Sequence, residues 1–294
     1  MKDSMPGGQF NRKKKLMPTA STAKFQQPKG PSLSDIQLIG RGLPTKLVVQ
    51  GVQGIGKTSF AFHAPSPLYV VTELGVETLI DAKQISETPF TPRVETWRGL
   101  LAILDELATA EHDYKTLVID TINGVEELCF NYVCNKRFDG DWGVHGFMSY
   151  QQGPRSAAVD WRQLLNQLDV LREERRMAII LISHTAVTTF KNPEGADYDR
   201  FAPVLSKEIW RLTDAWADIV LFYNYETIVS EKDPTKKGKG RGGGNIRFLY
   251  TQRTAAWDAK NRHGLPFEIE AGSSSQETWD NFIAAKKAAQ QKES

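Results

Sequence analysis

The segment GVQGIGKT at residues 51–58 constrains the fold of this chain more than any other feature. It matches the pattern G-x-x-x-x-G-K-[ST] at every fixed position, and it lies between the apolar run KLVVQ and a helix-like segment, GKTSFAFHA. In this strand–loop–helix unit the glycines let successive backbone N–H groups point inward at phosphate groups, and the helix adds its positive end. A glycine turn without a ligand is the alternative, but the flanking strand and helix favour a phosphate-binding loop.

We expect ATP to bind at nine consecutive positions of this segment, with Mg²⁺ held beside its phosphates. Lys57 would reach the outer phosphates, and the hydroxyl of Thr58 would meet the magnesium ion. The nine positions are Gly51, Val52, Gln53, Gly54, Ile55, Gly56, Lys57, Thr58 and Ser59.

Short apolar runs alternate with helical patterns between residues 46 and 184. The runs PLYVVTE, TLVID and MAIILISH are predicted strands, and the ranges 95–110, 123–138 and 155–175 are predicted helices. This alternation predicts an α/β fold with a mostly parallel sheet and helices on both faces. Later strand-like runs, ADIVLFYNYETIV and NIRFLYTQRT, predict an antiparallel extension at one edge, and residues 276–292 predict a terminal helix.

Charge is unevenly divided along the chain. Residues 1–50 contain nine Lys and Arg against two Asp, a net charge of +7, and residues 231–247 contain six against two, a net charge of +4. Both segments are poor in aliphatic residues, so they are either solvated linkers or arms for a polyanion. We expect a basic disordered tail over 1–44, a core over 45–272 with a basic Gly-rich hairpin tip at 231–245, and a C-terminal helix or tail over 273–294.

Composition excludes several classes of protein. Hydrophobic residues make up 40% of the chain and charged residues 24%, as in ordinary globular domains. The longest apolar runs fall far short of the ~20 residues that cross a bilayer, and no secretory signal pattern is present. Cys129 and Cys134 have the wrong number and spacing for a disulfide framework or a zinc site, so a cytoplasmic location is expected.

Three predicted strands end in a residue that carries chemistry. Asp120 ends TLVID, where it would hold magnesium or cap the next helix. Glu73 ends PLYVVTE as either a general base or a surface carboxylate, and His184 ends MAIILISH as either a γ-phosphate sensor or a satisfied polar group. Because ligands of such sheets bind at the carboxyl ends of the strands, the three residues together favour the functional interpretation.

These motifs together resemble a known family. The phosphate loop, VVTE at 70–73, LVID at 117–120, LISH at 181–184 and AKNRHG at 259–264 are similar to a RecA-type ATPase core. More closely, they resemble the compact phage nucleotide-binding proteins, often called Sak-type, that act as minimal recombinases or single-strand annealing ATPases. The resemblance covers roughly residues 45–272 and implies a RecA-like P-loop ATPase core.

The resemblance implies a role for each motif residue. Glu73 corresponds to the catalytic base and His184 to the sensor, with Lys57 at the phosphates. Lys260 and Arg262 correspond to cations that reach the nucleotide of a neighbouring subunit, although His263 replaces the aromatic residue of that motif.

Two segments are candidates for contact with single-stranded DNA. The range 185–205 follows the sensor strand, as the DNA-binding loops of RecA-type proteins do, and offers Lys191 and Arg200 beside aromatic residues. Its three acidic residues oppose that interpretation, and a lid over the nucleotide is the alternative. The basic tip offers cations for the phosphate backbone, unless it is a solvated loop: Lys236, Lys237, Lys239 and Arg241.

The sequence therefore predicts an ATP-dependent recombination or annealing protein that binds single-stranded DNA and forms a homo-oligomeric ring or filament. A phage-encoded protein of this kind would act in the bacterial cytoplasm, with a single-strand-binding protein as a further partner and no membrane. The alternatives are a hexameric helicase-like motor, a small-molecule P-loop kinase, and a binding module that uses ATP to set its assembly state. The aromatic insertion at 138–150 is compatible with base stacking, a subunit contact or core packing.

Overall fold

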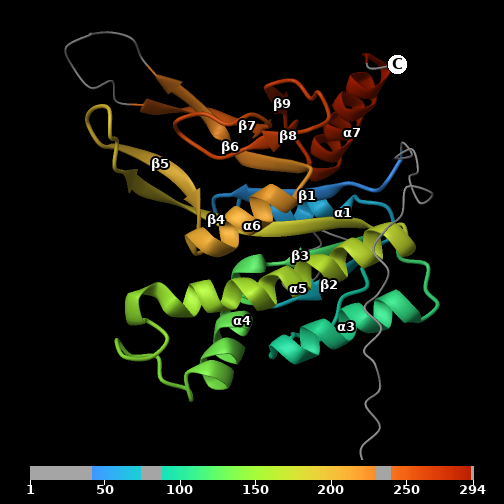
Figure 1. Cartoon of the computed structure of the whole chain (residues 1–294). Helices are drawn as coiled ribbons and strands as arrows, with labels where there is room; N and C mark the ends of the chain where they lie inside the picture. The colour runs from blue at the N-terminus through green and yellow to red at the C-terminus, as the bar shows by residue number, and fades with distance from the viewer. Residues whose placement is uncertain (1–41, 74–87, 230–239, 293–294) are drawn as a thin grey trace, which may run out of the picture. The chain divides into compact units, whose positions relative to one another are not determined.

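The computed structural model of the chain describes residues 42–73, 88–229 and 240–292 (Figure 1). Its helices are α1 (Lys57–Phe62), α3 (Trp97–Thr109), α4 (Ile122–Arg137), the 3₁₀ helix η2 (Ser149–Gln151), α5 (Gln152–Glu174), α6 (Lys207–Trp216) and α7 (Ser275–Lys292). Its strands are β1 (Lys46–Gly51), β2 (Pro67–Val71), β3 (Thr116–Asp120), β4 (Ala178–Phe190), β5 (Tyr198–Pro203), β6 (Ile219–Val229), β7 (Gly240–Tyr250), β8 (Lys260–Asn261) and β9 (Glu268–Glu270). None of the helices in these ranges has both the length and the apolar character that a bilayer crossing requires.

The strands form one mixed sheet in the order β2-β3-β4-β1-β6-β7-β9. The five strands from β2 to β6 in this order run parallel, and each contact between them is in register over several residues. β7 is antiparallel to β6, and β9 is antiparallel to β7. The predicted α/β fold, with a mostly parallel sheet and an antiparallel extension at one edge, is confirmed.

Helices cover both faces of the sheet (Figure 1). Because side chains alternate along a strand, β1 sends Val48 to one face and Leu47 and Val49 to the other. Val48 belongs to the apolar cluster that includes residues of α3, α4, α5 and α6, whereas Leu47 and Val49 belong to the cluster of α1 and α7. Both faces of the central strands are therefore buried, which explains their nearly continuous apolar sequence.

Helix α6 is an element that the sequence pattern does not predict. Its fully buried residues, Ile209 and Thr213, are four positions apart and so lie on one side of the helix. Thr213 accepts a hydrogen bond of 2.9 Å from the indole nitrogen of the buried Trp161 in α5. A single polar contact of this kind satisfies a buried tryptophan, and it fixes α6 against α5.

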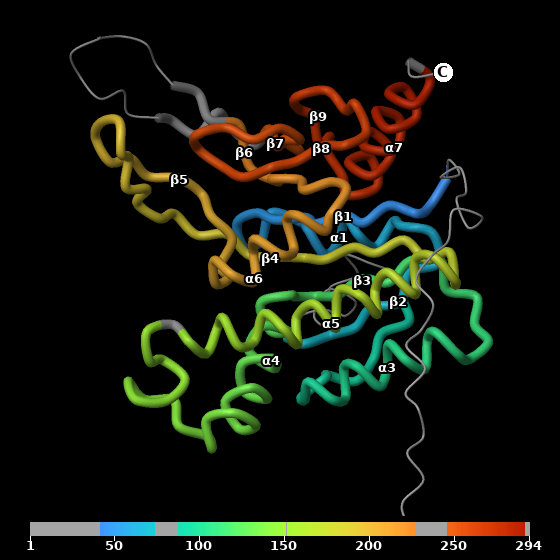
Figure 2. The backbone as a smooth tube through the Cα atoms, viewed as in Figure 1, coloured from blue at the N-terminus to red at the C-terminus, as the bar shows by residue number. Residues whose placement is uncertain are grey.

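The carboxyl edge of the parallel strands gathers the ends of the predicted motifs. Gly51 at the end of β1 pairs with His184 of β4, and Asp120 ends the neighbouring strand β3. β4 continues beyond this edge and pairs with β5, so part of the range 185–205 is a β-hairpin rather than the expected loop (Figure 2). β6 also continues beyond the edge and pairs with β7.

The aromatic insertion at 138–150 is anchored by one residue. Phe147 is buried, and its ring lies 5.1 Å from that of Phe130, 5.6 Å from that of Phe138 and 4.7 Å from that of Trp142. Tyr150 is 89% exposed. Core packing, one of the three roles left open for this insertion, therefore accounts for Phe147.

Candidate active site

Three glycines give the phosphate loop its path. Gly54 and Gly56 have φ angles of 77° and 107°, in the left-handed region that side-chain-bearing residues rarely adopt. At Gly51 a Cβ atom would lie 2.2 Å from the carbonyl oxygen of Tyr223 on the adjacent strand β6. The loop therefore depends on glycine at these three positions.

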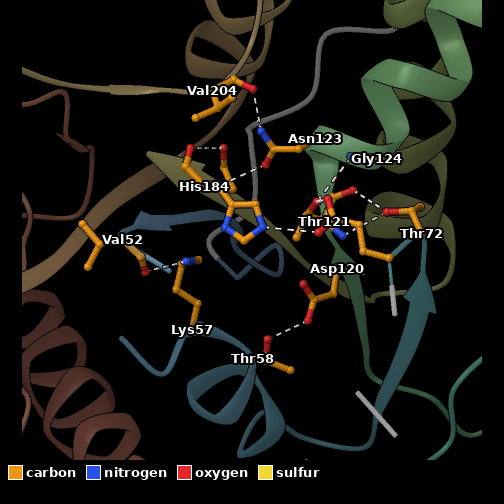
Figure 3. Close-up of polar contacts among 12 residues, drawn as sticks. Val52, Lys57, Thr58, Thr72, Asp120, Thr121, Asn123, Gly124, His184 and Val204 are labelled. Carbon is orange, nitrogen blue, oxygen red and sulfur yellow. Dashed lines mark hydrogen bonds and ion pairs between the residues drawn. The ribbon is translucent and has the colours of Figure 1, made fainter. Parts of the chain in front are cut away.

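Lys57, the first residue of α1, points back into the loop (Figure 3). Its Nζ donates hydrogen bonds of 2.9 Å to the carbonyl oxygens of both Gly51 and Val52. Burial lowers the pKa of the ammonium group to about 8, although the negative charges of Asp120 and Glu73 act in the opposite direction. A cation with so little hydration gains strongly from an anionic partner.

Thr58 and Asp120 bring two oxygen atoms together beside Lys57. The Thr58 hydroxyl donates a hydrogen bond of 2.7 Å to Oδ2 of Asp120 (Figure 3), and the Tyr69 hydroxyl donates one of 2.9 Å to the Thr58 carbonyl oxygen. Burial raises the pKa of Asp120, while the Thr58 hydrogen bond lowers it.

This pair of oxygen donors fits a magnesium ion. Mg²⁺ prefers oxygen ligands and commonly keeps water and phosphate oxygens in its shell, so it needs few protein ligands. The residues that the structure describes contain no cluster of three or more His, Cys, Asp or Glu that could enclose a metal on their own. Thr58 and Asp120 would thus hold the ion jointly with the nucleotide.

Glu73 lies where β2 ends, and both of its carboxylate oxygens are hydrogen-bonded. The Thr121 hydroxyl donates to Oε1, and Nε2 of His184 lies 3.3 Å from Oε2. The pKa of Glu73 is lowered, and the hydrogen bond from His184 is the largest cause. The hydrogen bond from Thr121 lowers the pKa further, whereas burial acts in the opposite direction. The carboxylate is therefore ionised at neutral pH.

Two threonines that the sequence pattern does not predict join the ends of β2 and β3. The Thr72 hydroxyl donates to the Thr121 carbonyl oxygen at 2.8 Å and accepts from the Thr121 backbone N–H at 3.0 Å. The Thr121 hydroxyl also accepts from the Gly124 N–H at 3.3 Å as the N-cap of α4, so the alternative role of Asp120 as the cap is wrong. Thr72 and Thr121 are polar residues that directly follow two apolar strands, and this sequence feature could have identified them.

Asn123 connects His184 to the base of the β4–β5 hairpin. Its side-chain oxygen accepts the His184 backbone N–H at 2.9 Å, and its amide donates to the Val204 carbonyl at 2.5 Å (Figure 3). The Val204 N–H in turn donates to the His184 carbonyl at 2.9 Å. His184 thus contacts Glu73 with its side chain and the hairpin with its backbone.

Lys260 and Arg262 lie at the amino-terminal ends of the parallel strands, opposite the carboxyl edge where the phosphate loop lies. Lys260 pairs with Val220 near the start of β6, whereas the phosphate loop leaves the carboxyl end of β1. Its Nζ donates to the carbonyl oxygens of Asp214 and Ala215, and Arg262 donates to that of Ala215 at 3.2 Å. The two cations are not brought to the phosphate loop of their own chain, and their role at a neighbour's nucleotide stays a prediction.

The predicted DNA-binding cations differ in their surroundings. Lys191 is exposed beside the β4–β5 hairpin and pairs with Asp197 at 2.6 Å. Arg200 is largely buried and pairs with Asp258 at 2.6 Å, so its guanidinium already has a carboxylate partner within the chain. Lys236, Lys237 and Lys239 lie outside the described residues, and Arg241 is described only by its backbone pairing in β7.

Comparison with known families matches most of the chain to a family model. The family model described as AAA domain matches residues 43–263, which is more than two thirds of the 294 residues. The matched range contains the phosphate loop, Glu73, Asp120 and His184. No curated protein matches the sequence.

The buried Lys57 predicts a pH-dependent stability of the nucleotide-free protein. Its pKa is about 8 when folded and near 10.5 when unfolded, so the unfolded chain binds more protons between these values and wild-type stability rises with pH there. The variant Lys57→Met lacks this rise. Its free energy of unfolding, measured relative to that of wild type, should therefore fall by an amount on the order of 3 kcal/mol between pH 8 and 10.5. Denaturant unfolding at about pH 7.5 and pH 10 measures this change.

The matched control is Lys115→Met, because Lys115 is exposed and precedes β3 at the opposite edge of the sheet. Its stability difference from wild type should be the same at both pH values. If the stability difference between Lys57→Met and wild type were also the same at both pH values, that result would contradict the burial of a charged ammonium in the loop.

Proposed function

The chain belongs to the AAA domain family, and from this premise we propose that it hydrolyses ATP in a magnesium-dependent reaction at the carboxyl edge of the sheet. The observation that carries the proposal is the carboxylate of Glu73, held by Thr121 and His184 on the same strand edge as the phosphate loop and the Thr58–Asp120 pair. These groups supply a cation for the phosphates, oxygen ligands for magnesium and a proton acceptor.

Each residue has a distinct task in this reaction. Lys57 exchanges its hydrogen bonds to Gly51 and Val52 for phosphate oxygens, and Thr58 and Asp120 would hold a magnesium ion, which when bound would supply positive charge beside the phosphates. Glu73 accepts a proton from the attacking water while the oxygen of that water bonds to the γ-phosphorus. The bond between that phosphorus and the bridging oxygen breaks, so ADP and phosphate are the products.

We propose that His184 links the nucleotide to the β4–β5 hairpin. A shift of Glu73 on ATP binding would change its 3.3 Å contact with His184, whose backbone is bonded to Asn123 and Val204 at the base of that hairpin. Small changes at a nucleotide site can be transmitted by such a polar contact to an adjoining element.

We propose further that the protein acts on single-stranded DNA. The β4–β5 hairpin presents Lys191 and the partly exposed Phe190, a cation and an aromatic ring suited to single strands. Together with the resemblance to Sak-type proteins, this supports an oligomeric, ATP-dependent protein that acts on single-stranded DNA in recombination or annealing. A hexameric helicase-like motor would share these residues, whereas a small-molecule kinase would remain monomeric and gain nothing from DNA.

Assembly would explain the position of Lys260 and Arg262. Cations far from their own phosphate loop can act only if a neighbouring subunit presents its nucleotide to them, in the manner of an arginine finger. Sedimentation with and without ATP tests for this assembly, and a monomer mass under both conditions would exclude it.

Replacing Glu73 by Gln should leave ATP binding intact and lower hydrolysis by at least ~10²-fold, because the amide keeps the shape but cannot accept the proton. Steady-state phosphate release and equilibrium ATP binding measure the two effects. Glu127→Gln is the matched control, since Glu127 lines the same cavity as Glu73 and is exposed. Hydrolysis by Glu73→Gln within a few-fold of wild type would assign the base to another group.

Neutralising Lys236, Lys237, Lys239 and Arg241 together should weaken the binding of single-stranded DNA of any sequence. Fewer counterions would be released. The slope of log affinity against log salt concentration is negative, and its magnitude should fall by up to about 3. Lys191→Ala should lower it by less than one, and Lys115→Ala, at the opposite edge of the sheet, should leave it unchanged. An unaltered slope in the quadruple variant would limit the basic tip to a linker role, and an unaltered slope in Lys191→Ala would remove the hairpin from the DNA contact.

A further inference from the structure

The buried residue Asp258 contacts three elements that are far from it in sequence, β5, α6 and β1. Its Oδ1 accepts a hydrogen bond of 2.6 Å from Nη2 of Arg200 in β5 and lies 2.7 Å from Nη2 of Arg253. Its Oδ2 accepts a hydrogen bond of 3.2 Å from the indole nitrogen of Trp210 in α6. The backbone carbonyl oxygen of the same residue accepts one of 2.5 Å from the side-chain amide of Gln50 in β1.

Gln50 brings this set of contacts next to the phosphate loop. It is buried in β1, which is paired with β4 on one side and with β6 on the other. It directly precedes Gly51, whose carbonyl oxygen accepts a hydrogen bond from Lys57. A change at the Gly51 carbonyl therefore occurs one residue away from a side chain that is bonded to Asp258.

Arg200 lies in the middle of the β4–β5 hairpin rather than at its base. It pairs with Thr188 of β4, and its guanidinium carbon is 5.8 Å from the centre of the Phe190 ring. The base of the hairpin is held separately, through the hydrogen bonds of Val204. A hairpin that is held only at its base can swing about that point, whereas the second contact, with Asp258, fixes its direction.

The residues that precede Asp258 pack against the same hairpin. The backbone N–H of Phe201 in β5 donates a hydrogen bond of 2.7 Å to the carbonyl oxygen of Ala256. The ring of Phe222 in β6 lies 5.1 Å from that of Phe201 and 5.3 Å from that of Trp257. These contacts fix the backbone from which the Asp258 side chain reaches the hairpin.

The ion pair between Arg200 and Asp258 is better suited to orient the hairpin than to stabilise the fold. Each of the two side chains is 12% exposed, so both charges have lost most of their hydration. For buried pairs the cost of desolvation offsets much of the attraction, and apolar residues of similar volume often stabilise a fold equally well. What the pair adds is direction, because a planar guanidinium donates its hydrogen bonds along fixed axes.

We propose that Asp258 is a positioning residue, which holds the β4–β5 hairpin in one direction and makes that direction depend on the occupancy of the phosphate loop. When ATP draws Lys57 away from the loop carbonyls, the change reaches Gln50 and, through its amide, the backbone of Asp258. The carboxylate then carries Arg200 with it. This connection is separate from the one through His184, and it rests on the proposed function because it needs a nucleotide in the loop.

A distance between spin labels measures the direction of the hairpin. One label is attached at Glu194→Cys, between β4 and β5, and the other at Glu106→Cys in α3, since both positions are exposed. The native residues Cys129 and Cys134 are buried and stay unlabelled. Electron-electron resonance spectra are recorded with and without AMP-PNP and magnesium, whose binding is measured separately by calorimetry. In wild type the distance should be narrowly distributed and should shift when the nucleotide binds.

Two variants separate the two parts of the role. Asp258→Asn keeps the shape of the side chain but loses its charge, so the distance distribution should broaden with and without nucleotide. Gln50→Met keeps an unbranched side chain that cannot donate, so the distribution should stay narrow and its shift with AMP-PNP should be lost. A residue that served stability alone would leave the nucleotide response of the folded protein unchanged.

The matched control is Asp169→Asn, with thermal melting as the check of folding for all variants. Asp169 also accepts hydrogen bonds from a cation and a tryptophan, Lys46 at 3.0 Å and Trp216 at 2.9 Å, but it lies away from the hairpin. It should keep both the narrow distribution and the shift.

A narrow distribution in Asp258→Asn would overturn the positioning role, and an unchanged shift in Gln50→Met would overturn the connection to the phosphate loop. Wild-type protein that binds AMP-PNP without any shift would overturn the inference and leave the proposed ATP hydrolysis intact. Wild-type protein that does not bind AMP-PNP would overturn the proposed function and this inference with it.

Discussion

The backbone of the phosphate loop bends around the ammonium group of Lys57, and the rest of the site depends on that bend. Left-handed Gly54 and Gly56 form it, and the close approach of Gly51 to Tyr223 fixes where it starts. The ammonium is buried against two carbonyl oxygens and carries a lowered pKa because it has lost most of its hydration. A charge in that state is stabilised by a nearby anion, as the phosphates of a bound nucleotide would be.

The parallel sheet brings the remaining groups to this loop. Because β1, β2 and β3 end at one edge, where β4 passes beside them, residues more than 100 positions apart in sequence become neighbours there. Hydrogen bonds of Glu73 to Thr121 and His184, and of Asn123 to His184 and Val204, then form one polar network. The network extends from the phosphate loop side of the sheet to the base of the β4–β5 hairpin, and under the proposal it is the route by which nucleotide state would reach the hairpin.

The sequence predicted those parts of the molecule that depend on local patterns. The phosphate loop, the apolar strands and their shared carboxyl edge follow from spacing and alternation alone, and they suffice to place Asp120 beside Thr58. The range 185–205 was expected to be a loop, because its hairpin pairing depends on contacts that periodicity does not encode. The pairing of Arg200 with Asp258 and the contact of Arg247 with Ile55 join residues distant in sequence, so no local pattern could have indicated them.

The central claim is that Lys57 and its loop bind the phosphates of ATP for hydrolysis. Steady-state ATP turnover in magnesium by the wild type and by Lys57→Ala, with folding verified by circular dichroism, tests this claim most directly. The account predicts turnover by the wild type that disappears in the folded variant and when magnesium is chelated. Turnover near the wild-type rate in folded Lys57→Ala would contradict it.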